Sequence, residues 1–146
     1  MAPTTTDEIV THLFARPLPP LEPGTQIYDT SIISSISALD EHRFVKAALH
    51  LANDDINHCH LIAQDSEGDS DADLLHATLH RREGDYWNSK YWYSRVRKHP
   101  VIPDISKAKS FVDACEKVKP GKDTQLREQQ WEELKKIVEW MRDNAQ

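Results

Sequence analysis

The segment from His76 to Trp92, HATLHRREGDYWNSKYW, concentrates side chains that can ligate metals, transfer protons and bind anions. Its seventeen residues include two histidines, two arginines, a glutamate, an aspartate, a lysine and four aromatic rings. The HxxxH spacing of His76 and His80 sets two imidazoles one turn apart on one face of a helix. Glu83, three residues later, extends this row as a carboxylate ligand or a general base. The segment therefore predicts a polar site on a helix.

His60 offers a third imidazole, on a neighbouring predicted helix. With Asn53 and Gln64 it falls on or beside an apolar stripe, and polar groups that face a core need partners because unpaired burial costs roughly 1–3 kcal/mol each. A set of three histidines and one glutamate suits Zn²⁺, Fe²⁺ or Mn²⁺, and its members are His60, His76, His80 and Glu83. Because HxxxH also occurs by chance in a chain with eight histidines, two alternatives stay open. The histidines could hydrogen-bond across helices, or one of them could act in metal-free acid–base chemistry.

Arg82 projects near the middle of an otherwise apolar helix face formed by Leu74, Leu75, Thr78 and Leu79. A guanidinium in that position must pair with an internal carboxylate, such as Glu83, Asp85 or an acid elsewhere, or with an anionic ligand. Both possibilities stay open.

The aromatic residues of the segment fall on the next predicted helix. The pairs Trp87–Tyr91 and Asn88–Trp92 are one turn apart, and the rings surround nearly the whole helix, which predicts a central helix contacted from several sides. Polar residues within this belt would suit a pocket wall. The remaining histidines are predicted to be ordinary surface or capping residues, with His58 on the side of its helix opposite His60; they are His12, His42, His50, His58 and His99.

The elements that must position these residues are helices, because the hydrophobic spacing is helical along almost the whole chain. The sequence predicts an all-α fold: a single domain over 1–146, with five or six helices and a Pro-rich extended N-terminal arm. Its parts are 1–37 (a short helix and the arm), 38–100 (the motif-bearing helices) and 101–146 (the C-terminal helices). The predicted helices cover 7–15, 38–64, 71–83, 86–97, 106–118 and 124–144, and 25–37 is irregular or a short helix.

Composition limits the function classes. The chain has 38% hydrophobic and 29% charged residues and a net charge of −6, which argues against general nucleic-acid or acidic-membrane binding. A basic zone from Arg81 to Lys98 carries six Lys and Arg against two acids. No apolar run approaches the roughly 20 residues of a membrane span, and the N-terminus does not resemble a secretory signal. We therefore expect a cytoplasmic protein with no membrane partner, whose two cysteines are free buried thiols.

Two segments together resemble a family of small helical proteins in bacteria and fungi. CHLIAQ (Cys59–Gln64) matches its His-x-x-x-Gln element, and LHATLHRREGDYWNSKYWYSRVRKHP (Leu75–Pro100) matches its HxxxHRRE-x-D-x-x-N-x-x-YW block, which ends in His-Pro. The resemblance covers about a quarter of the chain and implies no reaction, because the family has no settled activity. It singles out the following residues: His60, Gln64, His76, His80, Arg81, Arg82, Glu83, Asp85, Asn88, Tyr91 and Trp92.

These observations predict a protein that binds or turns over a small polar, anionic molecule in a pocket between helices, with or without a divalent metal. If it is an enzyme, hydrolase or lyase chemistry fits best, with His60, His80 or Glu83 as acid or base. Substrate would be bound by Gln64, Arg81, Arg82, Asp85, Asn88, Tyr91 and Trp92. The alternative is a non-enzymatic interaction module in which the same cluster is a structural hydrogen-bond network. That module would have buried, fully paired histidines and no cavity, whereas a binding protein would have a concave space bounded by His60, His80 and Tyr91.

Overall fold

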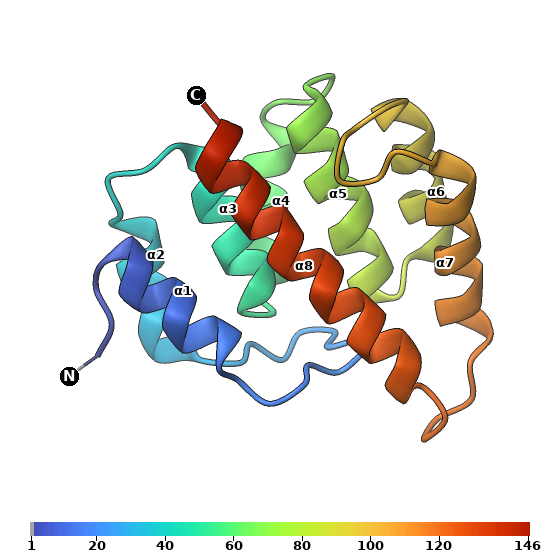
Figure 1. The fold of residues 1–146 in the computed structure, drawn as a ribbon, viewed down its shortest axis with the longest axis horizontal. Helices are drawn as coiled ribbons and strands as arrows, with labels where there is room; N and C mark the ends of the chain where they lie inside the picture. Colours follow the sequence, from blue (N-terminus) through green and yellow to red (C-terminus); the bar gives the residue numbers. More distant parts are fainter. Residues whose placement is uncertain (1) are drawn as a thin grey trace.

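The computed structural model describes residues 2–146, and these fold into α-helices (Figure 1). Their order is α1 (Thr6–Phe14), the 3₁₀ helix η1 (Thr30–Ile32), α2 (Ile33–Ser37), α3 (Arg43–Ala52), α4 (Ile56–Gln64), α5 (Ser70–Glu83), α6 (Tyr86–Val96), α7 (Ile105–Lys117) and α8 (Thr124–Asn144). The all-α class is confirmed: across 2–146 the only extended pairing is an isolated bridge between His99 and Ile102. The expected count of five or six helices is wrong, because the described chain has eight α-helices.

The predicted continuous helix over 38–64 is in fact two helices, α3 and α4. Between them Asp54 has a left-handed backbone with φ of 61°, which a continuing α-helix does not allow. Asp55 then caps α4, because its side chain accepts a hydrogen bond of 3.2 Å from the His58 backbone N–H. The apolar stripe continues across this break, so hydrophobic periodicity does not reveal it. The turn folds α4 back to pack beside α3.

The other helix boundaries follow local capping chemistry. Gly84 ends α5 with φ of 86°, and Asp85 caps α6 by accepting from the Asn88 backbone N–H at 3.3 Å, both as predicted. The left-handed backbone favours glycine here, and a Cβ atom on Gly84 would also displace the Glu22 carboxyl, from which it would lie 2.8 Å. At the start of α5 the cap is Asp69 and not the predicted Asp71.

The central helix is α5, and not α6 as the aromatic belt predicts. Every residue of α5 from Ala72 to Arg82 is buried, and α5 packs against both α4 and α6. In α6, Trp87 is 72% exposed and Tyr91 43% exposed. These two rings stack on each other with centroids 5.8 Å apart, so part of the aromatic surface of α6 packs against itself and faces solvent.

The last helix, α8, crosses in front of α3, α4 and α5 in Figure 1 and packs against α3. Its predicted apolar face is confirmed, because Trp131, Leu134, Val138 and Met141 are all buried. Each buried aliphatic side chain of this kind contributes about 1.5–3 kcal/mol relative to full exposure. This face fixes α8 on the core.

In the N-terminal region the structure has the predicted short helix, as α1, but not the predicted separate arm. Ile9 and Leu13 of α1 and Ile32 and Ile36 of η1 and α2 are fully buried members of the main core. The connecting residues 15–29 run along the lower edge of the molecule in Figure 1. Backbone carbonyls of this connection accept hydrogen bonds from side chains of α5 and α8, and the donors are Arg82, Arg127 and Gln130. The connection is therefore fixed to the helices by polar contacts.

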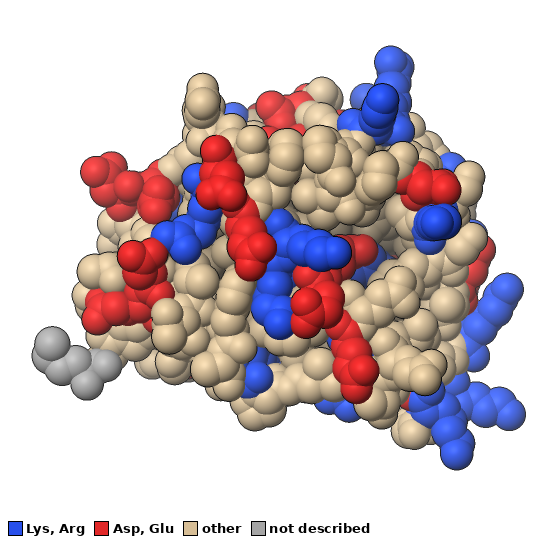
Figure 2. All heavy atoms as spheres, in the orientation of Figure 1, with Lys and Arg blue, Asp and Glu red and all other residues tan. Residues whose placement is uncertain are grey.

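Acidic and basic side chains are interspersed on the face that carries α8 (Figure 2). None of the described helices is both long enough and apolar enough to cross a bilayer. Both cysteines are free and buried, as predicted. Burial raises the pKa of the Cys115 thiol to about 11 and also raises the pKa of Cys59.

Candidate metal centre

Three imidazoles from two adjacent helices converge between α4 and α5. The Nε2 atoms of His60 and His76 lie 3.1 Å apart. The ring centroid of His80 lies 4.8 Å from that of His76 and 5.4 Å from that of His60. One ring nitrogen of each histidine lies within 4.8 Å of one from each of the other two. The i,i+4 spacing on α5 and the inward face of α4 therefore bring these rings together as the sequence predicts.

Neighbouring side chains fix the orientation of two of the rings. Trp92 of α6 stacks on His76, with centroids 3.9 Å apart and planes 14° from parallel. The Nδ1 atom of His80 hydrogen-bonds the Glu83 carboxylate. Carboxylates commonly hold the second nitrogen of a metal-binding histidine in this way, so Glu83 lies where it orients His80.

The electrostatics of the cluster favour neutral imidazoles. Burial, followed by the proximity of His80 and His60, lowers the pKa of His76 to about 3. Burial and then His80 also lower the pKa of His60. Two facing Nε2 lone pairs repel each other unless a proton or a cation lies between them. In a tetrahedral zinc site with Zn–N bonds of about 2.0–2.1 Å, ligand nitrogens are roughly 3.3–3.4 Å apart, which is close to the His60–His76 separation.

His76 also has an unpartnered ring nitrogen, because its buried Nδ1 has no hydrogen-bond partner. The fully paired network expected of a purely structural cluster is therefore incomplete at this residue.

A cavity of about 280 Å³ lies beside the cluster. It is lined by Gly24, Thr25, Ile27, Asp54, Asp55, Ile56, Asn57, His60 and Glu83. The sequence predicts a concave space bounded by His60, His80 and Tyr91; of these three, His60 lines this cavity. No lysine or arginine is among the described residues that line it. An anion in this cavity would need a bound cation to attract it.

The two arginines of the motif point away from the histidines and are paired internally. Arg81 donates to Tyr93 Oη at 2.9 Å and to Glu133 Oε1 at 2.9 Å. Arg82 is fully buried and donates to Asp54 Oδ1 at 2.6 Å. Of the two possibilities left open for Arg82, the structure has the internal one, but the partner is Asp54 and not Glu83 or Asp85. The reason is the turn between α3 and α4, which places Asp54 against α5.

The remaining predicted binding residues are dispersed. Asp85 and Asn88 pair with each other at the start of α6, with Asn88 Nδ2 donating to Asp85 Oδ2 at 2.7 Å. Gln64, the last residue of α4, is exposed. Tyr91 meets the Trp92 ring edge-on at 5.4 Å. Two members of this group lie at the histidine cluster: Trp92 stacks on His76, and a carboxylate oxygen of Asp85 lies within 4.8 Å of ligand atoms of His80 and Glu83.

Sequence reasoning missed a second polar cluster. His50 and His99 were expected at the surface or in caps, yet both are buried. His50 lies with Asp55 and His58 in a second group of potential ligand atoms, whereas His99 hydrogen-bonds Asp71 at 2.6 Å. His42 does cap α3, as expected. The pair Asp54-Asp55 offers a cap for the next helix, but the partners of Asp54, Arg16 and Arg82, are distant in the chain and give no local signal.

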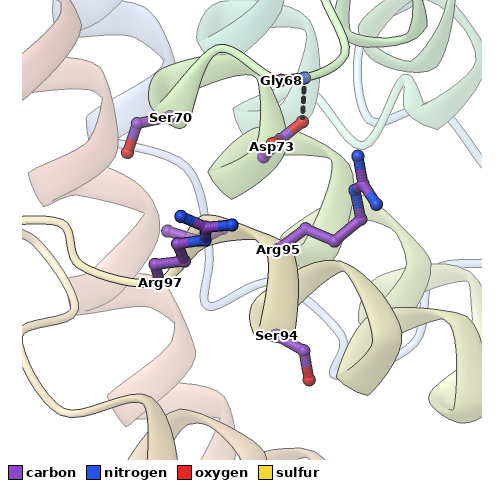
Figure 3. A pocket seen from close by; sticks show the side chains of 7 residues that line it. Gly68, Ser70, Asp73, Ser94, Arg95 and Arg97 are labelled. Carbon is purple, nitrogen blue, oxygen red and sulfur yellow. Dashed lines mark hydrogen bonds between the residues drawn. The ribbon is translucent and has the colours of Figure 1, made fainter.

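A separate cavity of about 520 Å³ lies between the loop before α5 and the end of α6 (Figure 3). Arg95 and Arg97 extend into it near Asp73, which accepts a hydrogen bond from the Gly68 backbone N–H at 3.1 Å. Burial raises the pKa of Asp73. These two arginines belong to the basic zone of the sequence, but they line a different cavity from His60.

No protein-family model, curated protein or solved structure matches the chain. The function is therefore argued from the geometry of the cluster, and the family resemblance of its motifs stays an expectation.

Proposed function

We propose that the protein binds one divalent transition-metal ion through His60, His76 and His80, and that this ion binds or turns over a small polar molecule in the adjacent cavity. The observation that carries the proposal is the convergence of three imidazole nitrogens within 4.8 Å beside a cavity of about 280 Å³. Three histidines with one open coordination position are typical of catalytic zinc sites. Zn²⁺, Fe²⁺ and Mn²⁺ are the candidate ions.

The reaction class that fits best is metal-assisted hydrolysis. A divalent ion lowers the pKa of a bound water and polarises a carbonyl or phosphoryl oxygen. Glu83 lines the cavity and hydrogen-bonds His80, so its carboxylate would orient His80 and accept a proton from the attacking water. Because no cationic side chain is among the described lining residues, the ion itself would hold an anionic group of the substrate. Arg81 and Arg82 have no substrate-binding role in this proposal, since internal carboxylates already pair with both.

The direct test is metal analysis of untagged protein by inductively coupled plasma mass spectrometry. We expect about one equivalent of metal to be lost in His80→Ala and retained in His12→Gln. The control removes an imidazole that belongs to none of the potential ligand groups among the described residues, while keeping a side chain that can bond Asp29, the partner of His12 at 2.7 Å. Hydrolysis of simple phosphate and carboxylate esters should require the same ion and the same histidine. Equal metal content in His80→Ala and His12→Gln would reject the site.

The second candidate is the non-enzymatic interaction module, and one observation favours it. Trp87, Leu61 and Tyr91 are 72%, 52% and 43% exposed, and large exposed apolar side chains are enriched in protein-binding surfaces. A module of this kind would lose its partner in Trp87→Ala and keep it in His80→Ala. The metal-dependent function predicts the reverse pattern for ligand binding in the cavity.

A further inference from the structure

A second cluster of potential ligands lies at the turn that separates α3 from α4. His50 comes from the last turn of α3, Asp55 caps α4, and His58 lies in the first turn of α4. The imidazoles of His50 and His58 stack with centroids 4.8 Å apart. None of these three residues belongs to the His60–His76–His80 centre.

Three buried atoms of this cluster make no hydrogen bond of normal geometry, although two of them, Asp55 Oδ2 and His58 Nδ1, lie within ion-pair distance of each other. The three atoms are His50 Nδ1, Asp55 Oδ2 and His58 Nδ1. The side chains of His50 and Asp55 are each only 2% exposed, so water does not compensate for the missing bonds. An unpaired buried polar atom costs roughly 1–3 kcal/mol, so His50 Nδ1 in particular lacks a partner, and a cation within reach of all three residues would supply one.

The separations fit a metal ion as that partner. Asp55 Oδ2 lies 2.7 Å from His58 Nδ1 and 3.8 Å from His50 Nδ1. Ligand atoms around a tetrahedral zinc ion are roughly 3.3 Å apart for bonds of about 2.0–2.1 Å, so on binding an ion Asp55 and His58 would move apart, and Asp55 and His50 together, by roughly half an ångström each. Two histidines and one carboxylate form a recurrent ligand set for Zn²⁺ and Fe²⁺.

The other polar atoms of the cluster are already engaged. Asp55 Oδ1 accepts from the His58 backbone N–H at 3.2 Å, and His50 Nε2 lies 3.5 Å from Ser37 Oγ. These contacts leave one potential ligand atom on each residue, and the three atoms lie within 4.8 Å of one another. The His58 side chain is 41% exposed, so an ion could enter from solvent on this side.

We infer that His50, Asp55 and His58 form a second, independent site for a divalent transition-metal ion. The ion would connect the end of α3 to the start of α4 and so stabilise the turn that carries Asp54. It would occupy different side chains from the ion of the proposed function, and neither site requires the other.

The test is zinc binding by equilibrium dialysis, with untagged protein that has first been treated with a chelator. His80→Ala removes the first centre, and we expect it to retain about one equivalent of Zn²⁺. Adding His58→Ala or Asp55→Asn to His80→Ala should remove this remaining equivalent. His58 is partly exposed, and asparagine still caps a helix, so both changes should preserve the fold, which circular dichroism would check. His12→Gln in the His80→Ala background is the matched control and should keep the ion.

The outcomes separate this site from the first one. Two equivalents in the wild type with one lost in each of His80→Ala and His58→Ala support both sites. One equivalent that is lost only in His58→Ala supports the second site and rejects the first. A natively folded His80→Ala protein that binds no Zn²⁺ would overturn this inference, as would zinc that persists when both His58 and Asp55 are changed.

Discussion

Two buried polar clusters contact α5 at nearby positions, Arg82 and His80, and their polar groups find partners in different ways. The arginine cluster consists of Asp54, Arg16 and Arg82, and the histidine cluster of His60, His76 and His80. Asp54 accepts from Arg82 at 2.6 Å and from Arg16 at 2.8 Å, so its carboxylate is neutralised from both sides. His80 belongs to a group of imidazoles in which His60 and His76 have mainly each other as partners, at 3.1 Å. The arginine cluster has its opposite charge within the chain, although Arg16 Nε and Arg82 Nε make no hydrogen bond. In the histidine cluster only His80 has a carboxylate partner, Glu83, whereas His60 and His76 have none, so this cluster is the one suited to an external ion.

The largest effect should follow from changing the centre of the arginine cluster. Asp54→Asn removes the buried charge but keeps a residue that tolerates a left-handed backbone. Loss of one member of a buried ion pair costs about 3–5 kcal/mol, and we expect a decrease of this size in the free energy of unfolding, measured with urea. Glu132→Gln is the control, because Glu132 pairs with Lys135 at the surface and its side chain is 65% exposed. If Asp54→Asn lowers the free energy of unfolding no more than this control does, the arginine cluster does not stabilise the fold.

Metal should stabilise the protein through the histidine cluster. Zn²⁺ at 100 times its dissociation constant should add about 2.7 kcal/mol to the free energy of unfolding. The gain should shrink in His80→Ala and fade below about pH 6, where protons compete for imidazoles. Urea titrations in the presence of Zn²⁺ and in the presence of a chelator measure this difference in the free energy of unfolding. If Zn²⁺ raises the free energy of unfolding of the double variant His80→Ala/His58→Ala as much as that of the wild type, the ion binds elsewhere. The histidine cluster would then not differ from the arginine cluster in binding an external ion.

Without metal, the buried histidines should make stability depend on pH. Burial lowers the pKa of His76 to about 3 and that of His50 to about 4, whereas both return to about 6.5 on unfolding. The unfolded chain therefore binds more protons below pH 6.5, and stability falls as the pH falls from 6.5 toward 4. Each histidine contributes about 1.4 kcal/mol per pH unit in this window. His76→Gln should flatten the curve, measured in chelator; an equally steep curve would show that His76 is not buried in its neutral form.

The smallest effect should come from the aromatic surface of α6. Trp87 is 72% exposed, and surface substitutions usually change stability by less than about 0.5 kcal/mol. Trp87→Ala should therefore leave both the free energy of unfolding and the metal content near their wild-type values. A larger loss of stability would mean that Trp87 packs in the fold more than its exposure indicates, and loss of a protein partner would favour the interaction module.

Much of the fold follows from local sequence signals. Gly84 and Asp85 end one helix and cap the next through contacts within a few residues, so the boundary between α5 and α6 can be predicted. The predicted range of α8 agrees with the structure because its apolar spacing is regular from Thr124 to Asn144. The proximity of His60 to the α5 histidines also follows, since both helices direct these residues inward.

The sequence by itself determined the all-α class, most helix boundaries and the shared face of His76 and His80. Only the tertiary structure decided the break at Asp54, because its left-handed backbone is held by Arg16 and Arg82, which lie 38 and 28 positions away in the chain. Along one continuous helix, His50 and His58 would be separated by about 12 Å of rise. The turn instead stacks their rings at 4.8 Å. Contacts between distant residues overrode the helical periodicity, and they created the second cluster that the sequence pattern did not reveal.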